Sequence, residues 1–129
     1  MTVRIASVTF DCADALTLGR FWSAALGRPL DPKASSDFAT IGFDGRRDTE
    51  GWAPVEPGSH PTWMFVKVPE QKVAKNRMHL DVMARDPEAE VARLVQLGAT
   101  RGADMDEYGY TWTVMADPEG NEFCVAKSL

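Results

Sequence analysis

An internal repeat constrains the fold of this chain more than any other feature of its sequence. The segment 78–98, MHLDVMARDPEAEVARLVQLG, reads as a strand, an Asp-Pro helix start, an amphipathic helix and a glycine stop. The segment 6–27, ASVTFDCADALTLGRFWSAALG, has the same order of elements and ends on the same Leu-Gly pair. A repeat whose period is about half the chain is too long for a solenoid and predicts two equivalent modules.

Both predicted helices begin at an aspartate and end at a glycine. Asp14 and Asp86 are N-cap candidates, because their carboxylates can accept from the free amides of the first turn. Pro87 suits the first helical position, and Gly27 and Gly98 suit a left-handed stop. The apolar residues between each cap and its glycine recur at helical spacing, as in a helix that packs on a sheet. They are Leu18, Phe21, Trp22, Ala25 and Leu26 in the first helix, and Val91, Leu94 and Val95 in the second.

The remaining apolar segments alternate in polarity or are rich in β-branched residues, which predicts strands. These segments are 3–12, 38–43 and 62–68 in the first half, and 78–82, 100–105, 108–116 and 121–127 in the second. Residues 46–61 hold several glycines and prolines without any period, which predicts a long loop.

Each half therefore reads as one strand, one helix and about three further strands. The sequence predicts an α+β fold in which two paired βαβββ modules, about 1–68 and about 77–129, form a U-shaped mixed sheet within a single domain 1–129. A half of this size buries little core alone, so the modules are expected to pair around a cleft that binds a ligand.

Charge and composition exclude several classes of function. The formal net charge is −5, without a run of one sign, which argues against a nucleic-acid or anionic-membrane surface. No apolar stretch approaches the roughly 20 residues of a membrane span, and the start of the chain does not resemble a signal peptide. We therefore expect a cytoplasmic protein. The two cysteines, Cys12 and Cys124, are expected to be free buried thiols.

Strand alternation predicts which side chains face the cleft. Met78, Leu80 and Val82 should pack on the second helix, which leaves His79 and Asp81 on the other face. The same argument applied to the first and last strands extends this polar face. The full set is Ser7, Thr9, Asp11, His79, Asp81, Glu122 and Cys124. Polar groups on the inner face of a sheet need partners, water or a ligand, because they are costly when unpaired.

Alternatives stay open for the histidine and the tryptophans. His79 is either a metal ligand or general base, or a structural residue that is hydrogen-bonded to Asp81 or Glu122 or lies at a solvated edge. Trp63 and Trp112 either line an aromatic pocket or belong to the core. Trp52, within the predicted loop, is expected to pack over something, since an indole is costly to leave in water.

Four segments in order, the FDCAD-helix-LG opening, KNRMHLD, ARDPEAEVARLVQLGA and DPEGNEFCV, cover nearly the whole chain. In them the sequence resembles the glyoxalase-like branch of the vicinal oxygen chelate superfamily, which includes glyoxalase I, extradiol dioxygenases and bleomycin-resistance proteins. The resemblance implies paired βαβββ modules that form a U-shaped sheet around a cavity, often within a dimer, so we expect a homodimer.

In metal-using members of that superfamily, ligands come from equivalent strands of the two modules. Carried over by motif, these positions are Ser7, a residue of strand 62–68, His79 and Cys124. Only His79 is a conventional ligand for a hard or borderline ion, and octahedral sites need several imidazoles and carboxylates. We therefore expect no metal or other cofactor, with a divalent metal at His79 as the alternative.

Two functions are consistent with these residues. The first is a metal-independent, sequestration- or resistance-type protein that holds a partly aromatic small molecule in the cleft between the modules. The residues expected to bind the ligand are Ser7, Asp11, Trp52, Trp63, Asp81, Trp112 and Cys124. The second is a lyase- or isomerase-type enzyme, with or without a divalent metal, in which His79 and either Glu122 or Asp81 act as acid and base.

Overall fold

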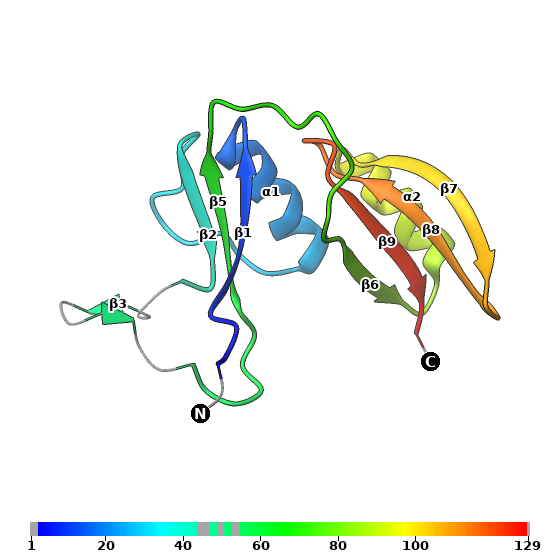
Figure 1. Cartoon of the computed structure of the whole chain (residues 1–129), viewed down its shortest axis with the longest axis horizontal. Coiled ribbons are helices and arrows are strands. Elements are labelled where there is room, and N and C mark those ends of the chain that lie inside the picture. Colours follow the sequence, from blue (N-terminus) through cyan, green and yellow to red (C-terminus); the bar gives the residue numbers. More distant parts are fainter. Residues whose placement is uncertain (1–2, 44–46, 49–50, 53–54, 129) are drawn as a thin grey trace. The chain divides into compact units, whose positions relative to one another are not determined.

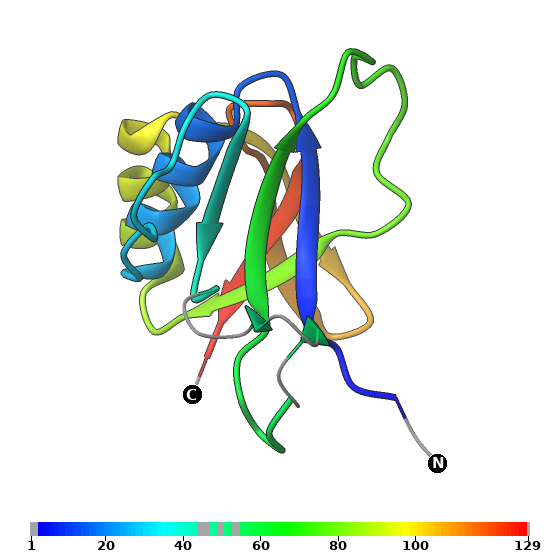
Figure 2. The same cartoon turned by 90° about the vertical axis from the view of Figure 1, so that its left-hand side faces the viewer.

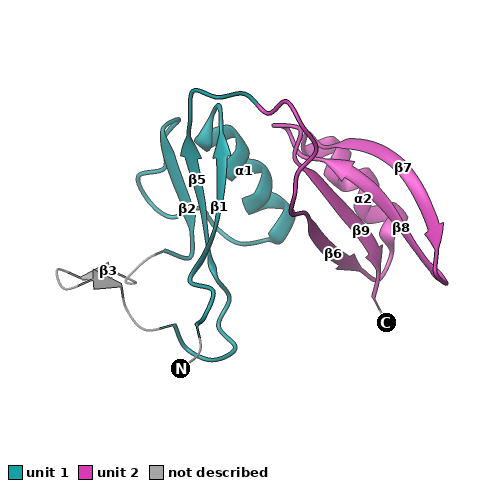
Figure 3. Cartoon of the chain, viewed as in Figure 1, with its two compact units in different colours: residues 1–71 teal, residues 72–129 magenta. Residues whose placement is uncertain are grey.

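The computed structural model describes residues 3–43, 47–48, 51–52 and 55–128, and for 47–48 and 51–52 it describes the backbone alone (Figure 1). The chain divides into two compact units, Met1–Gln71 and Lys72–Leu129 (Figure 3). Their boundary falls within the segment 69–77 that the sequence places between the modules. The structure defines each unit by itself, so the U-shaped sheet and the cleft between the modules stay predictions.

The first unit is a three-stranded sheet with one helix. Its elements are β1 (Ser7–Cys12), α1 (Ala15–Leu26), β2 (Phe38–Ile41) and β5 (Thr62–Lys67). Strand β5 lies between β1, to which it is parallel, and β2, to which it is antiparallel (Figure 2). Within the predicted loop, β3 (Arg47–Asp48) and β4 (Gly51–Trp52) pair as a separate two-stranded ladder.

The second unit is a complete βαβββ module. Its elements are β6 (Leu80–Ala84), α2 (Pro87–Leu97), β7 (Thr100–Glu107), β8 (Tyr110–Ala116) and β9 (Glu122–Lys127). The sheet order is β6-β9-β8-β7, in which β6 and β9 are parallel and the other neighbours are antiparallel. The predicted α+β class with two modules is confirmed. No helix in the described part of the chain is long and apolar enough to cross a membrane.

The two sheets differ by one strand, because an irregular segment takes the place beside β2 that β7 takes beside β8. Pro29 and Pro32 in this segment have no backbone N–H to donate to a ladder. Asp31 instead donates its backbone N–H to the carbonyl of Thr40, and its carboxylate accepts from the Thr40 hydroxyl and the Phe43 backbone nitrogen, both at 2.7 Å. The first module therefore ends its sheet with a hydrogen-bonded loop.

The helix ends follow the sequence closely. Asp14 accepts a hydrogen bond from the backbone nitrogen of Thr17 at 3.0 Å, and Asp86 accepts one from Ala89 at 3.1 Å. The first bond lowers the pKa of Asp14. Both helices end at the predicted glycines, which have positive φ angles of 64° and 121°.

Each helix packs on one face of its own sheet. The core of the first unit is aromatic: Trp22 of α1 meets Phe10 and Trp63 with ring centroids 5.8 and 5.3 Å apart. In the second unit the buried apolar side chains include Val91, Leu94, Met115, Phe123 and Val125. Val95 was predicted to be buried but is 44% exposed, because it lies about 100° around the helix from Leu94.

The strand ends differ from the prediction in the loops. β1 begins at Ser7, and Val3, predicted to lie in the strand, is almost fully exposed. Tyr108 and Gly109 have φ angles of 56° and 79° and form the turn between β7 and β8. Positive φ at both central residues is characteristic of a two-residue hairpin turn. β8 therefore begins at Tyr110 rather than at Tyr108.

Candidate functional site

The face of the second sheet opposite α2 carries most of the predicted site residues of this unit. Side chains alternate along β6 and β9, so the buried Phe123 and Val125 leave Glu122 and Cys124 on the open face. Asp81 occupies the same face of β6 and is paired in register with Cys124.

A concavity of about 750 Å³ lies over this face. Its apolar lining comes mainly from Met83, Trp112, Val114 and Ala126. Along each strand, these residues lie an even number of positions from one another or from the polar lining residues, so their side chains point to the same face. Its polar lining includes Lys75, His79, Asp81, Glu122 and Cys124. The volume is within the range of sites that hold a drug-sized molecule, and the combination of an apolar floor with a few polar groups is typical of such sites.

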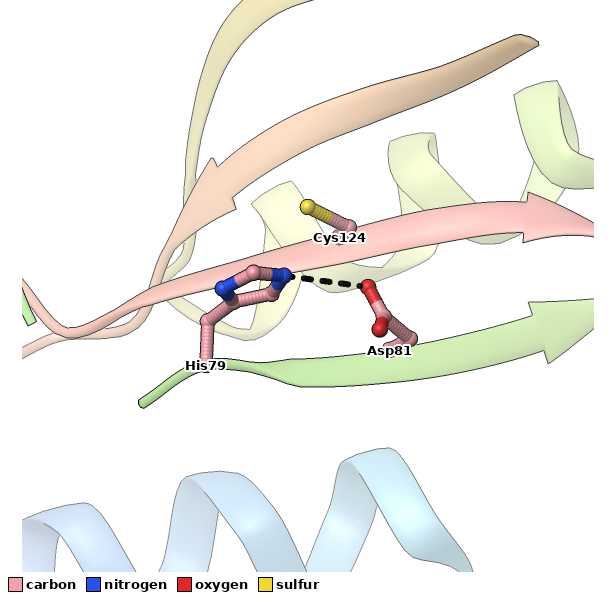
Figure 4. A group of neighbouring side chains, drawn as sticks. All are labelled: His79, Asp81 and Cys124. Carbon is pink, nitrogen blue, oxygen red and sulfur yellow. Dashed lines mark ion pairs between the residues drawn. The ribbon is translucent and has the colours of Figure 1, made fainter. Parts of the chain in front are cut away.

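Three side chains at this concavity converge (Figure 4). His79 Nε2 lies 3.4 Å from Asp81 Oδ1, and the Cys124 side chain projects from the neighbouring strand beside them. One donor atom from each of the three lies within 4.8 Å of the others. The imidazole and carboxylate side chains are 45% and 61% exposed, so a solute can reach both groups.

The thiol of Cys124 is in its protonated form in this setting. Burial raises its pKa, and the negative charge and hydrogen bond of Asp81 raise it further, against a smaller opposing effect of Lys75. Because a thiolate rather than a thiol is the reactive nucleophile, Cys124 is not activated for attack in the absence of a bound cation.

Glu122 is held by hydrogen bonds to the segment that precedes β6. Its Oε2 accepts from the backbone nitrogen of Asn76 at 2.9 Å, and its Oε1 accepts from Lys72 Nζ at 3.0 Å. The Asn76 bond is the main cause that lowers the pKa of Glu122 to about 2, with a further contribution from Lys72. A carboxylate this acidic is a weak base near neutral pH, so the geometry favours an anchoring role over proton transfer.

The predicted site residues of the first unit lie on two different faces. Ser7 and Asp11 occupy the face of β1 opposite the core, and their place in a shared site stays a prediction. Trp63 is only 9% exposed and stacks on Phe10 with ring centroids 5.5 Å apart. It is therefore a core residue, and the structure does not support its expected contact with a ligand. The side chain of Trp52 lies outside the described residues.

Several lining residues were missed in the sequence. Met83, Val114 and Ala126 could have been found, since they repeat the two-residue spacing of Asp81, Trp112 and Cys124. Lys75 comes from the irregular segment before β6, for which alternation gives no orientation.

A repeated strand–helix–sheet module, with a polar cluster on the open face of a sheet, defines a two-module α+β protein with a candidate ligand site. The chain belongs to the family of the glyoxalase-like domain, whose model matches residues 7–126. No curated protein matches the sequence significantly.

Solved structures of the glyoxalase/bleomycin resistance/dioxygenase superfamily share the fold. A family enzyme from Burkholderia phytofirmans is 18% identical with a TM-score of 0.68, over 98% of this chain and 100% of that one. A superfamily member from Sphaerobacter thermophilus is 18% identical with a TM-score of 0.62, over 98% of each chain. The bleomycin-binding protein from Streptomyces verticillus, solved with copper(II)-bleomycin, is 17% identical with a TM-score of 0.58, over 100% of this chain and 99% of that one.

Proposed function

We propose that this chain is a small-molecule-binding protein that holds a partly aromatic ligand in the concavity of its second unit. The observation that supports this most directly is the volume of about 750 Å³, with an apolar floor around Trp112 and polar groups at one side. An apolar floor favours burial of a ring, and a few polar groups orient it.

The contacts follow from the lining. Trp112 offers an indole face or edge to an aromatic ring, and the thioether of Met83 adds a favourable sulfur–aromatic contact. His79 and Asp81 can hydrogen-bond a polar substituent, and the ammonium group of Lys75 can pair with an anionic one. These ligand contacts need no metal.

We favour sequestration of the ligand as the role of this site. We also propose that the protein is cytoplasmic and forms a homodimer. The bleomycin-binding protein of Streptomyces verticillus shares the fold, and its likeness supports a binding role without identifying the ligand. The resemblance to resistance proteins in the four sequence segments supports the same role.

A thermal-shift screen of small aromatic compounds and thiol adducts tests the proposal. We expect at least one compound to raise the melting temperature of the chain, and Trp112→Ala to abolish that rise. Tyr108→Ala is the matched control, because Tyr108 is an exposed aromatic residue at the hairpin turn and does not line the concavity. A screen without stabilising compounds, or a shift retained in Trp112→Ala, would contradict the proposal.

The close approach of His79 and Asp81 favours a second candidate, an enzyme that moves a proton. A carboxylate oxygen 3.4 Å from the imidazole nitrogen can orient the ring while the ring accepts and returns a substrate proton. His79→Asn should then abolish turnover of a ligand found in the screen and leave the thermal shift largely intact. Turnover that survives this change would exclude His79 as the group that moves the proton, and absence of turnover in the unaltered chain would exclude the enzyme.

A further inference from the structure

The open face of the second sheet changes from polar to apolar along its strands. Side chains of β6, β9 and β8 form rows across this face, because paired residues lie opposite one another. One row holds Asp81 and Cys124, and the next holds Met83, Ala126 and Trp112. Two residues along a strand span about 7 Å. The concavity over this face therefore has a polar end and an apolar end.

One cation lines the polar end of the concavity without an ion-pair partner among the described residues. Glu122 is already paired with Lys72 at 3.0 Å, and Asp81 has the His79 ring 3.4 Å away. Lys75 also lines the concavity, but it forms no ion pair with any residue that the structure describes. The charge that this end lacks is therefore a negative one.

The segment that carries Lys75 is fastened to the last strand. Asn76, the next residue, donates its backbone N–H to Glu122 Oε2 at 2.9 Å, and Lys72 pairs with Oε1 at 3.0 Å. One carboxylate therefore holds the segment on both sides of Lys75. Burial is the main cause that raises the pKa of the Cys124 thiol, and the charge of Lys75 is close enough to oppose this shift.

We propose that the ligand is an aromatic carboxylic acid in its anionic form, with its carboxylate at Lys75 and its ring on Trp112. One ammonium group matches one negative charge. A phosphate monoester carries about two negative charges near pH 7, so it would leave charge uncompensated beside Asp81. The spacing of the rows suits a ring joined to the carboxylate by about one to three carbon atoms. This assignment rests on the binding role proposed for the concavity and adds the class of ligand.

Calorimetric titration of the full chain with matched acids and amides tests the assignment. The probes are phenylacetate, 3-phenylpropanoate and 4-phenylbutanoate, each compared with its uncharged primary amide. We expect at least one acid to bind about tenfold more tightly than its amide at low ionic strength, as a hydrogen bond between charged groups allows. The preference should shrink in about 0.5 M NaCl, because salt screens a solvent-exposed charge pair.

Substitutions of exposed residues locate the charge contact without disturbing the core. Lys75→Met should abolish the preference for the acid and leave the affinity for the amide unchanged, whereas Lys75→Arg, which keeps the charge, should retain most of the preference. Asp81→Asn should strengthen acid binding, because it removes a nearby negative charge. Arg77→Met is the matched control, since Arg77 is an exposed cation of the same segment that does not line the concavity. It should leave the preference intact.

The outcomes distinguish the class of ligand from the binding role itself. Equal affinity for acids and amides, a preference that survives Lys75→Met, or an equal loss in Arg77→Met would overturn the assignment and leave the binding role intact. A preference lost in Lys127→Met instead would place the carboxylate at the other lysine of the lining and would also overturn it. So would failure of both series to bind while another aromatic compound gives a thermal shift that Trp112→Ala abolishes. If no aromatic compound binds, both proposals fail.

Discussion

Glu122 accepts a hydrogen bond of 2.9 Å from the backbone nitrogen of Asn76, which fastens the segment before β6 to the last strand of the second unit. Lys72 adds a 3.0 Å ion pair to the other carboxylate oxygen. The same two contacts lower the pKa of Glu122 from an ordinary 4.5 to about 2. The folded structure therefore favours the charged form of this carboxylate.

Glu122→Gln should destabilise the second unit. The amide cannot accept as strongly from Asn76 and cannot pair with Lys72, and a hydrogen bond to a charged group contributes about 1.5 to 3 kcal/mol. Urea unfolding at pH 7 measures the loss. Glu107→Gln, an exposed change in the same sheet, should alter the free energy of unfolding by less than about 0.5 kcal/mol. Equal stability of the Glu122 variant and the unaltered chain would contradict the anchoring role.

The contribution of Glu122 should also depend on pH. Its folded-state pKa is depressed, so between about pH 4.5 and about pH 2 the unfolded chain binds a proton that the folded chain does not. The stabilisation is complete above this window and is lost as pH falls through it. The gap in unfolding free energy between the unaltered chain and Glu122→Gln should therefore narrow from pH 5 to pH 3. A gap that stays constant would show that the carboxylate has an ordinary pKa.

Substitution by alanine should have different effects on stability and on ligand binding at Trp63 and at Trp112. Trp63→Ala removes a ring packed among Phe10 and Trp22 and should cost about 3 to 5 kcal/mol of stability. Trp112→Ala removes a half-buried ring at the concavity and should cost less, but it should abolish ligand-dependent thermal shifts. Denaturant unfolding and the ligand screen give both values. A greater stability loss in Trp112→Ala would reverse the assignment.

Gly102 should not tolerate a side chain. It lies where the pairing of β7 with β8 shifts between Arg101 and Asp104, and an added Cβ would meet the Val114 carbonyl oxygen at 2.8 Å. Because the clash is with backbone, Gly102→Ala should cost about 1 to 3 kcal/mol, as overpacking does. Thermal unfolding tests this, with the adjacent Ala103→Gly as a control that adds no atoms. A neutral or stabilising alanine would mean that the strand has room there.

Asp86→Ala should lower stability by about 1 kcal/mol, because it leaves the Ala89 backbone nitrogen without its capping partner. Asp86→Asn keeps an oxygen that can accept this bond and should lose little. The comparison by denaturant unfolding separates the hydrogen bond from the charge. Equal losses in the two variants would assign the effect to the charge alone.

The parts of the fold governed by local chemistry were predictable from the sequence. The capping aspartates, the terminal glycines and the helical stripes each depend on residues within one turn of the chain, so the helix boundaries agree with the structure. The loop that replaces a strand beside β2 was not predicted, because it depends on a carboxylate, Asp31, reaching residues nine to twelve positions away.

The site was predictable where alternation along a strand decides orientation. This applies to Asp81, Cys124 and Glu122, which share one face of the second sheet. Alternation gave no information on the partners of Glu122, since Lys72 and Asn76 are brought to it by tertiary structure. Trp63 was ambiguous, because its face depends on its register opposite Val8, which only the folded sheet reveals.

The loop that Asp31 holds along β2 has a consequence for self-association. It occupies the carbonyl of Thr40 on the outer side of that strand, a group that a foreign polypeptide would need in order to dock there. A strand of another chain therefore cannot pair with β2 at this carbonyl and extend the first sheet there. Among the described strands of this sheet, β1 forms the other margin, where intermolecular strand addition could still occur.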